Sequence, residues 1–136
     1  MTVVDASVWI GSLLDDDAHH DPSVRWLSRQ LLRENCTLFA PSLLVPEVVG
    51  AIARRTGNRA LARSVLQGLL DFSALELLPL DPEMAVTAAR LAADLRLRGA
   101  DACYVAVAQA LDLPLVTWDE ELRDRAGQAV TVVEPE

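Results

Sequence analysis

The feature that most constrains the fold is the alternation of short apolar segments with longer segments of helical periodicity. Five short apolar segments predict buried strands, at residues 2–4, 37–40, 75–78, 115–117 and 130–133. At least one predicted helix separates each successive pair. Parallel neighbours require such crossovers, so the chain is predicted to form a three-layer α/β/α sandwich with a mainly parallel five-stranded sheet.

Capping residues set the predicted helix ends. Asp-Pro dipeptides at positions 21–22 and 81–82 place Asp as N-cap and Pro at the first helical position, and these helices are expected to end near residues 34 and 99. Ser42 is expected to cap the helix after the second strand. The remaining helices are expected to lie near residues 59–72, 101–111 and 119–125.

Composition limits the classes of protein. The chain has 136 residues, half of them hydrophobic, which predicts one domain spanning residues 1–136. No basic leader with an apolar stretch and no long uncharged apolar segment is present, so we expect a cytoplasmic protein without a membrane contact. A net charge of −8 argues against sequence-independent wrapping of nucleic acid, but allows a local basic groove.

Four acidic residues stand out because each is set against apolar sequence: Asp5, Glu47, Asp101 and Asp119. Each also has an ordinary structural explanation. Asp5 and Asp101 could be helix N-caps, a role that contributes about 1 kcal/mol. Thr117 and Glu120 fit a capping box, which would leave Asp119 as an ordinary acid in the first turn of a helix. Glu47 could be a half-exposed side chain at the edge of an apolar stripe.

Taken together, these acids point to a metal site. Asp5 and Asp119 follow strands directly, and the carboxyl ends of parallel strands share one edge, where Asp101 can also lie. Two carboxylates about 4 Å apart repel by about 4 kcal/mol at an effective dielectric near 20, so convergence favours a bound cation. Oxygen ligands without a convergent His or Cys favour Mg²⁺ or Mn²⁺ over zinc.

Four segments carry a family resemblance: VVDASVWI, the Glu in SLLVPEVVGAI, LRGADACYVAVA and LVTWDEEL. In this order they resemble the PIN-domain family and, within it, the VapC-like ribonuclease toxins of toxin–antitoxin pairs. The resemblance implies a sheet ordered 3-2-1-4-5, in which the first and fourth strands adjoin. It also implies a homodimer, an inhibitory antitoxin partner and Mg²⁺- or Mn²⁺-dependent hydrolysis of RNA phosphodiester bonds through a metal-activated water.

The resemblance also assigns roles to individual residues. Asp5, Asp101 and Asp119 would hold the metal directly or through water. Glu47 would complete the shell or orient the attacking water. Hydroxyl groups would support this site, and they match Ser7 and Thr117.

Several weaker signals have two readings. Six arginines lie near the acidic segments in the sequence: Arg54, Arg55, Arg59, Arg63, Arg96 and Arg98. They could bind RNA phosphates, or they could form solvated faces that pair with nearby acids. Both interpretations stay open. The adjacent His19 and His20 are not expected to share a metal. Core packing rather than base stacking is expected for Trp9, Trp26 and Trp118. Two buried free thiols are expected, at Cys36 and Cys103.

Other function classes were weighed against hydrolysis. A phosphoryl-accepting signalling domain and a DxD phosphatase both resemble families that need a lysine, and the chain contains none. Asp5-Ala6-Ser7 is moreover DxS rather than DxD. The alternative that stays open is a non-catalytic PIN-like interaction module whose acidic pocket binds a basic partner peptide.

Overall fold

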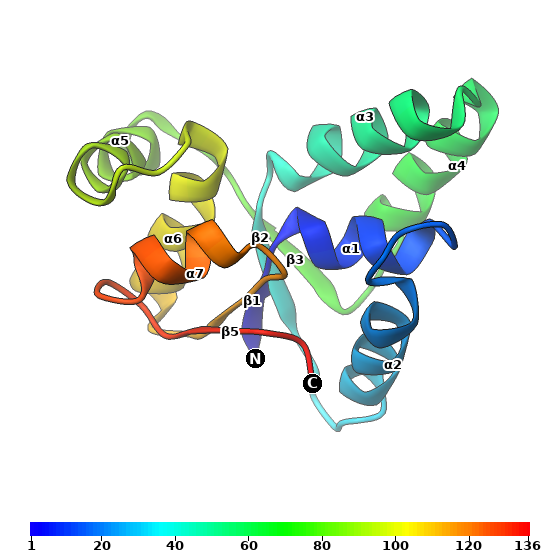
Figure 1. Cartoon of the computed structure of the whole chain (residues 1–136), viewed down its shortest axis with the longest axis horizontal. Coiled ribbons are helices and arrows are strands. Elements are labelled where there is room, and N and C mark those ends of the chain that lie inside the picture. The colour runs from blue at the N-terminus through cyan, green and yellow to red at the C-terminus, as the bar shows by residue number, and fades with distance from the viewer.

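Five strands form one parallel sheet in the computed structural model, which describes residues 1–136 (Figure 1). All four pairings are parallel, so every strand ends at the same edge. The order confirms the predicted 3-2-1-4-5 arrangement. Across the sheet, the strands are β3 (Leu75–Leu78), β2 (Leu38–Pro41), β1 (Thr2–Val4), β4 (Leu115–Val116) and β5 (Val132–Val133).

Seven helices cover the two faces of this sheet and confirm the predicted α/β/α layers. Figure 1 shows α1 to α4 on one side and α5 to α7 on the other. No helix has the length and apolar character needed to span a membrane. The helices are α1 (Ala6–Leu13), α2 (His20–Leu31), α3 (Leu44–Thr56), α4 (Arg59–Leu70), α5 (Pro82–Leu95), α6 (Gly99–Leu111) and α7 (Glu120–Ala126).

The core lies around β1 and α6. All three residues of β1 are buried, and so is every residue of α6 from Ala102 to Ala108, which explains why that segment is apolar nearly all round. Trp9 and Trp26 pack in the core as expected. Trp118 is only half-buried, and its ring stacks on His19 with 4.3 Å between the centroids. Both cysteines are free, but only Cys103 is buried.

Two predicted helix starts are wrong, and a different hydrogen bond is found at each, a local turn at His20 and a tertiary contact at Ser42. Helix α2 begins at His20 rather than after Asp21, since the backbone N–H of His20 already donates to the Asp17 carbonyl at 3.0 Å. Ser42 does not cap α3, whose N-cap Leu43 makes no side-chain cap bond. The Ser42 hydroxyl instead accepts a hydrogen bond from the backbone N–H of Leu80 at 3.3 Å, beyond the end of β3.

The boundary between α5 and α6 also differs from the prediction. Asp81 caps α5 as expected, and its carboxylate accepts from the Met84 backbone N–H at 2.8 Å. The helix does not extend to Gly99, because Arg96 turns into the left-handed region at φ 56° and ends it. Gly99 becomes the first residue of α6, so Asp101 lies in the first turn of that helix and is not its N-cap.

Candidate functional site

The adjacency of β1 and β4 places two of the predicted acids at one edge of the sheet. Val4 is paired with Val116 in the parallel ladder, and the backbone N–H of Asp5 continues it by donating to the Val116 carbonyl at 2.9 Å. Asp119 follows β4 by three residues. The adjacency that the sequence required for Asp5 and Asp119 to converge is therefore present.

Asp5 is a buried carboxylate, with 6% of its surface exposed. It caps α1 by accepting from the Ser7 backbone N–H at 3.3 Å, and it accepts from the Thr117 hydroxyl at 2.8 Å. Burial raises the pKa of Asp5, and these hydrogen bonds oppose that rise. No cationic side chain pairs with it. Asp5 is thus both an N-cap and an acid whose charge is costly to bury.

Two hydroxyl groups connect the start of α1 to the loop after β4. The oxygens of Ser7 and Thr117 lie 3.3 Å apart. The Ser7 hydroxyl accepts from the Trp118 backbone N–H at 3.1 Å, and the Thr117 hydroxyl accepts from the Asp119 backbone N–H at 3.0 Å. Both hydroxyls therefore hold the backbone that carries Asp119, and the Thr117 hydroxyl also contacts the Asp5 carboxylate.

Asp119 caps the last helix, contrary to the capping-box alternative. Its Oδ1 accepts from the Leu122 backbone N–H at 3.1 Å, which makes Asp119 the N-cap of α7. Thr117 cannot serve that role because its hydroxyl is engaged with Asp5 and with the Asp119 backbone. The second carboxylate oxygen of Asp119 accepts from Nη2 of Arg98 at 3.0 Å. Of the two carboxylate oxygens of Asp119, only Oδ2 contacts a charged side chain.

Asp101 is held by the same arginine. Its side chain is 18% exposed, and its Oδ2 accepts from Nε of Arg98 at 3.2 Å. Burial and then the charge of Asp5 raise the pKa of Asp101, while Arg98 opposes the rise. One guanidinium thus bridges Asp101 and Asp119, two acids that are eighteen residues apart in the sequence.

Glu47 lies in the first turn of α3, a helix on the other side of the sheet from α6 (Figure 1). Burial raises the pKa of Glu47 to about 7, and the charges of Asp5 and Asp101 add to this effect, while a hydrogen bond from Tyr104 opposes it. Tyr104 has none of its surface exposed, and its hydroxyl donates to Oε1 of Glu47 at 2.8 Å. The four predicted acids therefore form one electrostatic cluster.

Tyr104 is the contact that sequence reasoning missed. Its position offered a signal, because a hydroxyl stands in an otherwise apolar helix, three residues after Asp101 and so on a neighbouring part of the same helix face. The hydroxyl of so deeply buried a tyrosine needs a partner. The partner could not be named from the sequence because Glu47 lies on another helix.

The donor set fits a hard divalent cation in its chemistry. Every side chain of the cluster that could bind a metal offers oxygen, and the mutual repulsion of the acids would be relieved by positive charge. No group of three or more acidic, histidine or cysteine side chains is already arranged to hold a metal. Arg98 instead supplies the nearby positive charge, on Asp101 and Asp119.

The other predicted basic residues make no ion pair with the four acids. Arg55 pairs with Asp17 at 2.8 Å and with Asp16 at 3.4 Å, which matches the expectation that these arginines pair with acids. His20 contacts the Gly11 carbonyl through Nδ1 at 2.9 Å, and neither His belongs to a metal-binding group. Exposed side chains without ion pairs are found at Arg54, Arg59, Arg63 and Arg96.

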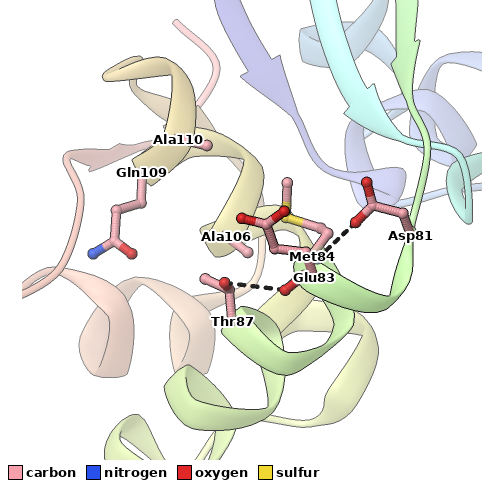
Figure 2. A pocket seen from close by; sticks show the side chains of 7 residues that line it. All are labelled: Asp81, Glu83, Met84, Thr87, Ala106, Gln109 and Ala110. Atoms are coloured by element: carbon pink, nitrogen blue, oxygen red, sulfur yellow. Dashed lines mark hydrogen bonds between the residues drawn. The ribbon is translucent and has the colours of Figure 1, made fainter.

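The cavities of the surface lie away from these acids. A hollow of about 290 Å³ lies between the start of α5 and the end of α6, and Figure 2 shows the side chains that line it. Its polar groups serve the helix, because Asp81 bonds the Met84 backbone and the Thr87 hydroxyl donates to the Glu83 carbonyl. An apolar groove of about 370 Å³ lies between α1, α2 and α4, and Trp9 and Phe72 are among its lining residues. None of the four acids lines a cavity.

Fold and sequence together define the class of this protein. A family model described as the PIN domain matches residues 2–128, and the chain belongs to that family. No curated protein sequence matches the chain.

Solved structures share the fold over nearly the whole chain. VapC20 of Mycobacterium tuberculosis, described as a toxin that cleaves the sarcin-ricin loop, is 16% identical with a TM-score of 0.77, covering 91% of this chain and 94% of that one. PAE2754 of Pyrobaculum aerophilum is 27% identical with a TM-score of 0.66, covering 98% and 89%. A toxin–antitoxin complex from Klebsiella pneumoniae contains a chain 18% identical with a TM-score of 0.70, covering 100% and 98%.

Proposed function

We propose that this chain is a metal-dependent endoribonuclease, the toxin of a toxin–antitoxin pair, that hydrolyses RNA phosphodiester bonds. The observation that carries this proposal is the buried Asp5, which has no cationic partner and shares one electrostatic cluster with Glu47, Asp101 and Asp119. Such crowded acids with raised pKa values are typical of functional sites. Membership of the PIN family and the likeness to VapC20 support the choice of RNA.

The proposed mechanism assigns each side chain a task. Asp5, Asp101 and Asp119 would hold Mg²⁺ or Mn²⁺ directly or through water. The bound ion would supply an activated water and would neutralise charge on the phosphate oxygens. Glu47 would complete the shell or orient the water, and the Tyr104 hydroxyl fixes its Oε1. Thr117 orients the Asp5 carboxylate through its 2.8 Å hydrogen bond.

Ser7 and the arginines complete the proposed site. The Ser7 hydroxyl holds the backbone before Asp119. Because the net charge is −8, RNA binding must rely on local positive charge rather than on the whole surface. We propose that RNA phosphates contact the exposed guanidinium groups of Arg54, Arg59, Arg63, Arg96 and Arg98. Arg55 would also contact a phosphate while keeping its ion pair with Asp17.

Partners are proposed from the chemistry of the site and from the solved relatives. The chain in the Klebsiella complex is bound in a toxin–antitoxin assembly, which supports a cognate antitoxin here. A basic antitoxin segment could place an Arg among the acids and block metal or substrate. We also infer that residues 1–136 form one nuclease domain that works in the cytoplasm as a homodimer, an oligomeric state that light scattering would measure.

Cleavage of purified transfer, ribosomal and messenger RNA tests the function. We expect cleavage with Mn²⁺ or Mg²⁺, loss of cleavage with a chelator, and recovery when the metal is restored in excess. Chelator-resistant cleavage would contradict the metal-dependent mechanism. If no RNA is cleaved but a basic peptide binds to the acids, the chain is instead the non-catalytic interaction module.

A further inference from the structure

Arg98 is the only cationic side chain paired with any of the four acids. Its Nε donates to Oδ2 of Asp101 at 3.2 Å, and its Nη2 donates to Oδ2 of Asp119 at 3.0 Å. The guanidinium fork makes this possible, because two of its nitrogens reach two different carboxylates. Arg98 therefore supplies positive charge to two acids that the proposed function assigns to a metal.

A divalent cation and this guanidinium compete for the same oxygens. Oδ1 of Asp119 already accepts from the Leu122 backbone N–H, and Oδ2 accepts from Arg98, so each oxygen of this carboxylate has one of its two lone pairs occupied. No three acidic, histidine or cysteine side chains are placed to bind one metal ion. This agrees with the ion pairs of Arg98, which hold the carboxylates of Asp101 and Asp119. Binding of a metal to these oxygens would require the guanidinium to move.

The position of Arg98 allows such a movement. It is the N-cap of α6 and makes no side-chain cap bond there, and 71% of its side chain is exposed. Ion pairs of exposed arginines are weak, so leaving the two carboxylates costs little, and no packed core has to open. The released guanidinium would stay tethered at the start of α6, beside Asp101 and Asp119.

We propose that Arg98 is a displaceable internal counter-cation that couples metal binding to RNA binding. Without metal, it neutralises Asp101 and Asp119; when the metal binds, its guanidinium is released and contacts an RNA phosphate. This inference rests on the proposed ribonuclease function. Coupling of this kind is reciprocal, so bound RNA strengthens metal binding in turn.

Calorimetric titration of the metal-free protein with Mn²⁺ tests the competition directly. Arg98→Gln removes the competitor, and we expect Mn²⁺ to bind on the order of tenfold more tightly than to the unaltered chain. Arg90→Gln is the matched control, because Arg90 is exposed on α5, has no ion pair and loses the same charge. Equal or weaker Mn²⁺ binding by Arg98→Gln, or an equal gain in Arg90→Gln, would overturn the competition.

RNA cleavage at saturating Mn²⁺ tests the second half of the proposal. We expect Arg98→Gln to raise KM several-fold with a smaller change in kcat, and to lower the salt dependence of RNA binding by about one phosphate contact. Arg98→Lys should recover part of the KM change, since it keeps the charge without the fork. An unchanged KM would overturn the phosphate contact. Should the unaltered chain cleave no RNA, the proposed function fails, while the Mn²⁺ titration still decides the competition.

Discussion

The two ends of β1 show how differently this protein treats buried polar groups. Thr2 is the first residue of this strand and Asp5 directly follows its last, and their exposed fractions are 8% and 6%. The Thr2 hydroxyl donates to the Pro114 carbonyl at 2.9 Å, which satisfies a neutral group. Asp5 also has hydrogen bonds, but burial raises its pKa and no cation pairs with it. The Thr2 hydroxyl at the first end stabilises the fold, whereas Asp5 at the other end carries a buried charge without a cationic partner.

The surroundings of the two ends extend this contrast. The hollow beside the start of β1 is lined by side chains of both signs, Arg29 and Arg33 with Glu134 and Glu136. At the carboxyl edge, four acids cluster around a single arginine, Arg98, which forms ion pairs with only two of them, Asp101 and Asp119. Mixed charges are ordinary at a protein surface, whereas crowded like charges lower stability and are typical of sites retained for function. The contrast suggests variants that separate the two roles.

The largest expected effect is on activity, from Asp5→Asn. The change keeps the shape and the helix cap but removes the negative charge, so we expect RNA cleavage to fall by about 10³-fold or more. Activity assays with Mn²⁺ measure the loss, and circular dichroism checks the fold. Thr2→Val, at the other end of β1, is the matched control and should cleave normally. Cleavage by Asp5→Asn within tenfold of the unaltered chain would refute the assignment.

Thr117→Val should affect both stability and activity. The variant loses the donor to Asp5, the acceptor for the Asp119 backbone N–H and the contact with the Ser7 hydroxyl, at a residue with none of its surface exposed. We expect the free energy of unfolding to fall by about 2–3 kcal/mol, and cleavage to fall because both acids lose their support. Urea denaturation and cleavage assays measure these effects. Thr117→Ser, which keeps the hydroxyl, should lose much less of either.

Glu47→Gln should reveal, through its dependence on pH, the cost of burying the charge of Glu47 and placing it beside Asp5 and Asp101. In the metal-free protein the pKa of Glu47 is about 7, above its ordinary value of 4.5, so the folded state holds the proton more tightly than the unfolded state. The stability from this group is therefore present below pH 4.5 and lost as the pH rises through about 7.

The Gln variant stays neutral and can still accept from Tyr104. At about pH 8 it should be more stable than the unaltered metal-free chain by about 1–3 kcal/mol, and the difference should vanish below about pH 4.5. Thermal or urea unfolding across this range measures the difference. A gain independent of pH would show that charge at Glu47 is not its cause.

The smallest effect is expected at the amino end of β1. Thr2→Val removes one neutral hydrogen bond, and we expect a loss of about 1 kcal/mol in the free energy of unfolding. The loss stays small because the Pro114 carbonyl still accepts from the Val3 backbone N–H at 2.9 Å. Urea denaturation measures it. A loss as large as that of Thr117→Val would remove the contrast between the two ends of the strand.

Patterns in the sequence predicted the layers of the fold, because strand and helix periodicities are local signals that short windows carry. The 3-2-1-4-5 order came from the family resemblance, and the structure confirms it. Helix starts were less predictable. Asp81 caps α5 as expected, but Ser42 and Asp21 fit local rules and still do not cap, because Leu80 and Asp17 supply competing hydrogen bonds.

The sequence by itself determined which residues could form a site: acids set against apolar segments are too costly to bury without a purpose or a cap. It did not determine their partners. The Tyr104 bond to Glu47 and the bridge from Arg98 to Asp119 join residues 57 and 21 positions apart. Only the tertiary structure decided these contacts, because they depend on which helices and strand ends the parallel sheet brings together.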